Sequence, residues 1–197
     1  MAFEKLLYFD TETGGLNPEL NPVLSLSGCI YNLNKDLGQY ESEEFNFFTS
    51  PPSDYVIEAS ALTVNNMTLD FIRQQESYSQ TYEKLVNLFD KYIDKYNRNN
   101  KFTLIAYNSD FDVSFLEAFF KYHKNNFLFS YISHYTIDVY ELVKHVYYLY
   151  NLPLENLKLS TVCKYFGIEH KAHISMSDVH ATLQLYNKLT TTYMKGF

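Results

Sequence analysis

The chain has 197 residues, a formal net charge of -7 at pH 7 and a hydrophobic content of 46%. This length fits one domain, which we expect to span residues 1–197, and the composition excludes a disordered or fibrous protein. The acidic balance argues against a broad basic face for duplex nucleic acid, because contacts to many phosphates need clustered lysine and arginine.

The cysteines and the hydropathy pattern indicate the cellular setting. Cys29 and Cys163 are the two cysteines, and two do not make a secretory disulfide framework. The apolar run near the N-terminus is too short for a signal peptide, and no apolar stretch approaches the roughly 18 residues of a membrane span. We therefore expect a cytoplasmic protein with reduced thiols and no membrane segment.

The first third of the chain is predicted to form three strands. Apolar runs at 4–10 and 23–32, and an alternating pattern at 40–49, indicate these strands. Residues 35–38 are typical of a hairpin turn, and a short helix is expected at 53–60, after a pair of prolines.

The remaining chain is predicted to alternate between strands and helices. Residues 82–96 carry apolar side chains at helical spacing, while 102–106 and 135–137 are β-prone. Further helices are expected at 110–123, 138–150, 157–166 and 177–194. This order predicts an α/β fold with a central mixed five-stranded sheet flanked by helices, its early strands antiparallel and its later strands parallel.

Two acids stand one residue apart at the end of the first predicted strand. Side chains at i and i+2 share one face of a strand, so Asp10 and Glu12 would converge at its carboxyl end. That edge is where ligands bind in open α/β sheets. Converging carboxylates repel each other unless a cation lies between them, and such hard oxygen ligands suit Mg²⁺ or Mn²⁺. A solvated acidic turn, bent by Gly14 and Gly15, is the alternative.

Two later motifs open predicted helices with an aspartate. Asp112 lies in AYNSDFDVSFL, and Asp178 lies in HISMSDVHATLQLY. Each aspartate also fits a capping box, because Ser109 and Ser175 stand three residues before them. Alternatively, both reach the same sheet edge and share a metal with the first acidic pair. His173 suits proton transfer beside such a metal, because its unperturbed pKa is near neutral.

The joint order of these motifs resembles the histidine subclass of the DEDD 3′–5′ exonucleases. The chain has Asp-x-Glu at the first strand, Asn-x-x-Phe-Asp ending at Asp112, and His-x-x-x-x-Asp from His173 to Asp178. The tyrosine subclass has Tyr four residues before the last Asp, where this chain has Ile174. The resemblance extends from about residue 8 to 186 and implies a ribonuclease H-like fold. Where the family often has His-Asn-Ala, this chain has Tyr-Asn-Ser at 107–109.

The resemblance implies hydrolysis of phosphodiester bonds at the 3′ end of nucleic acid, with release of nucleoside 5′-monophosphates. Asp10, Glu12, Asp112 and Asp178 would hold two divalent ions, Mg²⁺ or Mn²⁺, and His173 would act as general base. Single-stranded DNA is the favoured substrate, with RNA as the other. The resemblance also leaves open a homodimer and an association with a polymerase.

The same resemblance implies contacts to the substrate. The backbone near Thr13 and Gly14 would meet the terminal 3′-OH, and Leu16 would wedge against the terminal base. Asn108 is expected to be a further substrate-binding residue. Phe111 and Phe115 are candidates for base stacking, although core packing on their helix also explains both.

Two hypotheses without nuclease activity are alternatives to this one. A zinc-binding module could use Cys163, His170, His173 and His180, although their spacings fit no standard zinc finger. A non-catalytic interaction protein could retain the nuclease fold, because fold alone does not determine function. The complete set of four acids and a histidine argues against this second hypothesis.

Overall fold

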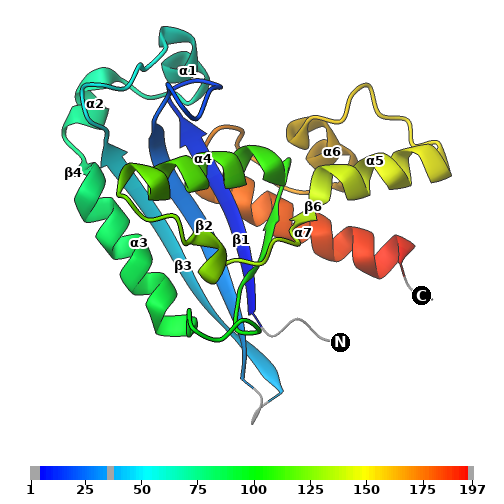
Figure 1. Ribbon diagram of the computed structural model, residues 1–197. Helices are drawn as coiled ribbons and strands as arrows, with labels where there is room; N and C mark the ends of the chain where they lie inside the picture. Colours follow the sequence, from blue (N-terminus) through cyan, green and yellow to red (C-terminus); the bar gives the residue numbers. More distant parts are fainter. Residues whose placement is uncertain (1–4, 35–37, 195–197) are drawn as a thin grey trace.

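The computed structural model describes residues 5–34 and 38–194, arranged as a sheet with helices on both faces (Figure 1). Residues 35–37 of the predicted hairpin turn lie outside the described residues. The strands are β1 (Lys5–Thr13), β2 (Val23–Asn34), β3 (Gln39–Ser50), β4 (Glu76–Ser77), β5 (Thr103–Ala106) and β6 (Ile137–Asp138). The helices are α1 (Ala59–Val64), α2 (Leu69–Arg73), α3 (Tyr78–Tyr92), α4 (Ser109–Tyr122), the 3-10 helix η1 (Leu128–Ser130), α5 (Val139–Tyr150), α6 (Leu159–Phe166) and α7 (Ser175–Tyr193). In the described part of the chain, no helix has both the length and the apolar character needed to cross a membrane.

The sheet is mixed, as predicted. Its strands lie in the order β4-β3-β2-β1-β5-β6. Strands β1, β2 and β3 pair antiparallel, whereas β5 is parallel to β1 and β6 is parallel to β5. The prediction of five strands was wrong: across the described residues the sheet has six, because β4 pairs with the end of β3. A two-residue strand is too short to produce the alternation that identifies strands in sequence.

Helices cover both faces of the sheet and bury two separate cores. Helices α3 and α4 lie over one face, and α7 lies behind the other face, with α5 and α6 beside it (Figure 1). Strand β1 contributes to both cores in turn, since Leu7 and Phe9 belong to the first core and Tyr8 to the second. Asp10 and Glu12 have the same parity as Tyr8, so alternation directs both carboxylates toward the α7 layer.

The first predicted helices differ from the structure. Residues 53–58 are not helical, and α1 begins at Ala59. Helix α3 begins four residues before its predicted start, because Ser77 and Gln80 form a capping box. The apolar pattern predicts that this helix continues to residue 96, but α3 ends at Tyr92. The buried side chain of Ile93 keeps the helical spacing, although its backbone is already extended.

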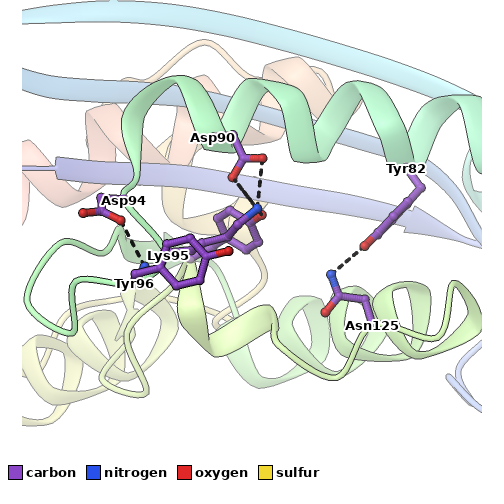
Figure 2. A network of polar contacts seen from close by, with 7 residues as sticks. Tyr82, Asp90, Asp94, Lys95, Tyr96 and Asn125 are labelled. Atoms are coloured by element: carbon purple, nitrogen blue, oxygen red, sulfur yellow. Dashed lines mark hydrogen bonds and ion pairs between the residues drawn. The ribbon is translucent and has the colours of Figure 1, made fainter.

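Polar contacts join α3, near both of its ends, to the segment after α4 (Figure 2). The Asp90 carboxylate accepts hydrogen bonds from the Tyr131 hydroxyl at 2.9 Å and from the Lys95 ammonium at 3.2 Å. The Asn125 amide donates to the Tyr82 hydroxyl at 2.7 Å. These contacts hold α3 and α4 together as one layer over the sheet.

Candidate active site

Three of the predicted metal ligands converge at the end of β1. Ligand oxygens of Asp10 and Glu12, from β1, and Asp178, from α7, lie within 4.8 Å of one another. Alternation along β1 explains the first two, and the packing of α7 on that face explains the third. A shift in the pairing register of β1 with β2 follows Glu12, so the ladder becomes irregular at the acids.

Asp112 approaches the group from the opposite face. One of its carboxylate oxygens accepts hydrogen bonds from the backbone N–H and the hydroxyl of Thr11, both at 2.9 Å. Thr11 has the other parity on β1 and faces the α4 layer, which carries Asp112. Asp112 therefore lies outside the tight group of three, but its negative charge raises the pKa values of Asp10 and Glu12.

Neither of the capping boxes proposed for Asp112 and Asp178 forms. The Ser109 hydroxyl contacts that of Thr136 at 3.0 Å, and α4 begins from Asn108 without a side-chain cap. The Ser175 hydroxyl accepts from the Ser27 hydroxyl at 2.8 Å, which ties the start of α7 to β2. The structure therefore removes the capping boxes as an explanation of the two aspartates, and their role in a site at the sheet edge stays a prediction.

Burial raises the pKa of all four carboxyl groups, and their mutual repulsion adds to this effect at β1. Burial and then the charges of Asp178 and Asp112 raise the pKa of Glu12 to about 8. Burial raises the pKa of Asp112 to about 7, although the hydrogen bonds from Thr11 oppose the shift. Protons or cations must compensate such a cluster near neutral pH.

The donor set fits hard divalent cations. The Oδ2 atom of Asp10 is buried and has no hydrogen-bond partner within residues 5–34 and 38–194. A buried carboxylate oxygen without a partner costs free energy, and Mg²⁺ and Mn²⁺ prefer carboxylate oxygen ligands. The residues that would hold such ions are Asp10, Glu12, Asp112 and Asp178.

The loop before α7 directs two histidines to the site. His173 is exposed, has a φ of 61° and donates its backbone N–H to Asp178 Oδ2 at 3.2 Å. His170 Nε2 contacts the other oxygen of Asp178, and its side chain is only 6% exposed. Sequence reasoning assigned His170 only to the zinc hypothesis, because a spacing of eight residues across a loop carries no periodic signal.

The four residues of the zinc hypothesis do not converge. Cys163 is buried as a free thiol, and His170 faces Asp178. The His180 ring contacts a carboxylate oxygen of Glu44 at 2.8 Å on the surface. Among the residues that the structure describes, the group with metal-ligand geometry is the acidic one. The structure thus provides no basis for a zinc-binding module.

A pocket of about 380 Å³ opens beside the carboxylates. Glu12, Thr13, Leu16, Phe111 and His173 are among its lining residues. Leu16 is 81% exposed, so it is accessible for the base contact that the resemblance implies, and that contact stays a prediction. The second stacking candidate, Phe115, is buried in the core and does not reach the pocket.

Two residues predicted to contact the substrate, Gly14 and Asn108, form backbone hydrogen bonds within the protein. Gly14 donates its N–H to the carbonyl of Pro22 at 2.8 Å and accepts from the N–H of Glu58 at 2.7 Å, so both backbone groups are engaged. Asn108 lies in a different pocket and donates its N–H to Asp138 at 3.0 Å. Their contacts to substrate stay predictions.

The chain matches the family model described as exonuclease over residues 7–186. DNA polymerase III subunit epsilon of Treponema pallidum (strain Nichols) is 23% identical over 188 residues, which cover 95% of this chain and 77% of that protein. Ribonuclease T of Buchnera aphidicola subsp. Baizongia pistaciae is 26% identical over 191 residues, which cover 93% of this chain and 82% of that protein.

Solved structures with a similar fold include E. coli Exonuclease I. Its complex with a dT13 oligonucleotide has a TM-score of 0.77 and 22% identity, and the match covers 96% of this chain but only 41% of that chain. The zinc-bound form of its complex with single-stranded DNA has a TM-score of 0.80 and 20% identity. This likeness confirms the expected fold, and the family match supports an enzyme over a non-catalytic interaction protein. The chain therefore belongs to the exonuclease family, and it is a 3′–5′ exonuclease of the DEDD type that its motifs predict.

Proposed function

We propose that the protein removes nucleoside 5′-monophosphates from the 3′ end of single-stranded DNA by a reaction that needs two divalent metal ions. The observation that carries this proposal is the convergence of Asp10, Glu12 and Asp178, with Asp112 adjoining, beside a pocket of about 380 Å³. We propose single-stranded DNA over RNA as the substrate because the Exonuclease I structures with this fold contain single-stranded DNA or a dT13 oligonucleotide.

The four carboxylates would hold the two ions, Mg²⁺ or Mn²⁺. When bound, the ions supply positive charge that attracts the phosphate and stabilises the charge that develops on it during hydrolysis. Four carboxylates and two divalent ions sum to zero charge, whereas the carboxylates alone repel a phosphate. An acidic protein can therefore bind nucleic acid at this one place, because the compensating charge is local.

His173 would take the proton of the attacking water. Its side chain has no hydrogen bond to any part of the chain that the structure describes, and it lines the pocket together with Glu12. The hydrogen bond from its backbone N–H to Asp178 fixes the loop against the acidic group, which is the set of four carboxylates named above. The free imidazole thus lies beside the carboxylates, where a general base is needed.

The pocket beside the carboxylates would hold the terminal nucleotide. Leu16 and Phe111 provide apolar surface for the base, and the Asn65 amide donates to the carbonyl of Thr13 at 3.0 Å, which stabilises the wall of the pocket. Apolar and aromatic contacts accept every base, because each base has a π-face. This tolerance suits an enzyme that shortens strands of any sequence.

The test is a time course on 5′-labelled single-stranded DNA and RNA of equal sequence, with Mg²⁺ or Mn²⁺. The wild-type protein should produce a ladder that shortens from the 3′ end, faster on DNA. Asp10→Asn and Asp112→Asn should lose about 1,000-fold or more in rate, and His173→Ala about 100- to 10,000-fold.

Asp110→Asn is the matched control, because Asp110 lies in the same first turn of α4 as Asp112 but is exposed. It should retain wild-type activity. Full activity in Asp10→Asn, or in EDTA, would contradict the mechanism, and faster cleavage of RNA would overturn the substrate preference alone. The single domain at 1–197, the homodimer, the association with a polymerase and the cytoplasmic location stay predictions.

A further inference from the structure

We propose that a second pocket, at the carboxyl ends of β5 and β6, binds the part of the strand just upstream of the scissile phosphate. Tyr140 would contact a base, and Lys158 would pair with a backbone phosphate. This inference rests on the proposed function and adds to it a subsite that distinguishes long substrates from single nucleotides.

The pocket has a volume of about 470 Å³ and is lined by Tyr107, Asn108, Tyr140, Leu157 and Lys158. A volume of this order is typical of ligand sites in proteins. Its residues come from three segments: the first follows β5, the second follows β6, and the third immediately precedes α6. Both strands run parallel to β1, so the pocket opens at the same edge of the sheet as the acidic group.

One carboxylate ties the residues of the second pocket to the start of α4, the helix that carries Asp112. Asp138 accepts hydrogen bonds from the N–H groups of Asn108 at 3.0 Å, Ser109 at 3.2 Å and Tyr140 at 2.9 Å. It thereby joins the start of α4 to the start of α5. Asp112 lies four residues beyond Asn108, which is about 6 Å along a helix axis. A strand with its scissile phosphate at the acids can therefore reach this pocket.

The two pockets lie on different sides of the acidic group. The first is walled by residues of α1 and of the chain that follows β1, among them Ala61 and Leu16. The second lies beyond β5, and β5 is the neighbour of β1 on the side away from β2. A strand that ends in the first pocket and crosses the carboxylates continues toward the second.

Lys158 provides charge complementarity for a phosphate. Its ammonium forms no hydrogen bond or ion pair within residues 5–34 and 38–194, and its side chain is exposed. The lysines of α3, α4 and α5 on the same molecule are instead paired with carboxylates, namely Lys84, Lys91, Lys121 and Lys144. The chain has a net charge of -7, so most of it repels a phosphate. The unpaired ammonium of Lys158 would instead attract one beside the site.

The aromatic side chains of the pocket are held in place before any strand binds. The Tyr107 hydroxyl donates to the carbonyl of Leu157, and the Tyr107 ring meets the Tyr140 ring edge-on, with centroids 5.7 Å apart. Lys144 lies over the Tyr140 ring, 6.0 Å from its centroid. The half-buried Tyr140 ring is thus an ordered surface for a base, at little cost in side-chain entropy.

The experiment compares a substrate that fills both pockets with one that fills only the first. The long substrate is a 12-nucleotide single strand of thymidylate, and the short one is the p-nitrophenyl ester of thymidine 5′-monophosphate, both with Mn²⁺. Tyr140→Leu and Lys158→Gln should each raise KM for the long substrate about 10-fold and leave kcat unchanged. Both variants should hydrolyse the short ester as the wild-type protein does.

Two further measurements separate this role from a structural one. Tyr140→Phe keeps the ring and should keep the wild-type KM. Lys158→Gln should lower the slope of log KM against log salt concentration by about 0.7, the value for one phosphate contact in a single strand. Lys164→Gln is the matched control, because Lys164 is exposed on the same helix, α6, and does not line the pocket.

An unchanged KM for the long substrate in both Tyr140→Leu and Lys158→Gln would overturn the subsite. So would an equal loss on the long substrate and the short ester, since that result would indicate a disturbed reaction centre. A wild-type protein that cleaves neither substrate with Mg²⁺ or Mn²⁺ would instead overturn the proposed function itself.

Discussion

At Asp178, donors from a single loop engage both carboxylate oxygens. His170 Nε2 contacts Oδ1, and the backbone N–H of His173 donates to Oδ2. Burial raises the pKa of Asp178, and the contact with His170 is the largest influence that opposes this shift. The orientation of one predicted metal ligand therefore depends on a histidine outside the motif that identified the ligand.

We predict that His170 positions Asp178 for metal binding. His170→Phe should weaken Mn²⁺ binding to the substrate-free protein about 10- to 100-fold, the usual effect of removing a group that orients a ligand. His170→Gln retains an N–H donor and should recover part of the affinity. Isothermal titration calorimetry measures both variants without relying on activity.

His180→Ala is the control for this prediction. His180 lies on α7, two residues after Asp178, but its ring contacts Glu44 on the surface. It should bind Mn²⁺ as the wild-type protein does. Equal Mn²⁺ affinity in His170→Phe and His180→Ala would show that the contact with Asp178 has no role in metal binding.

Strand β1 serves the core and the site through its alternation. Leu7 and Phe9 bury themselves against the α3 and α4 layer, while the acids face the α7 layer. Strand β2 packs closely beside β1 at this point, where Gly28 lies directly opposite Phe9 in the ladder. A Cβ atom at Gly28 would lie 2.6 Å from the Phe45 ring and 2.9 Å from the carbonyl oxygen of Tyr8.

We therefore expect Gly28→Ala to destabilise the protein by about 1–3 kcal/mol, because the added methyl group overpacks the interface between the strand and Phe45. For a chain of this size, each kcal/mol corresponds to a fall in Tm of about 2–4 °C. Thermal unfolding followed by circular dichroism measures the change. Ser42→Ala, at an exposed position of β3, is the control and should unfold at the wild-type temperature. A Tm for Gly28→Ala within 1 °C of the control would contradict this close fit.

The acidic group makes the stability of the whole molecule depend on pH and metal. The folded-state pKa of Glu12 is about 8, against an ordinary value of 4.5. Between these two values the folded protein binds more protons than the unfolded chain, so rising pH favours unfolding. Divalent ions bind the folded state and stabilise it by mass action.

In the EDTA-treated protein, the contribution of the acidic residues to Tm should therefore decrease as the pH rises from 5.5 to 8. Excess Mg²⁺ should raise Tm more at pH 8 than at pH 5.5. Glu12→Gln should remove much of this fall. His123 contributes a change of stability with the opposite sign. Burial lowers its pKa, so a rise in pH toward neutral stabilises the folded protein through this residue. The difference in Tm between the wild-type protein and Glu12→Gln, measured by calorimetry at each pH, isolates the acids. A difference that does not change with pH would contradict the prediction.

Local pattern alone determined the parts of this protein that depend on periodicity and spacing. The alternation along β1 predicts that Asp10 and Glu12 share a face, and the structure has them together. Helical periodicity predicts α4 and α5 to within one residue at each end. The three motifs identify the family, because their order in the chain does not depend on how the chain packs.

Tertiary structure alone decided how separate segments meet. The contact of Asp112 with Thr11 joins residues 101 positions apart, and β4 exists only because it pairs with the end of β3. His170 reaches Asp178 through the path of a loop, and the second pocket forms where three segments end side by side. Neighbours along the chain impose a period that can be read from the sequence. Contacts across space are chosen by the burial and hydrogen bonding of the whole fold, so no local pattern encodes them.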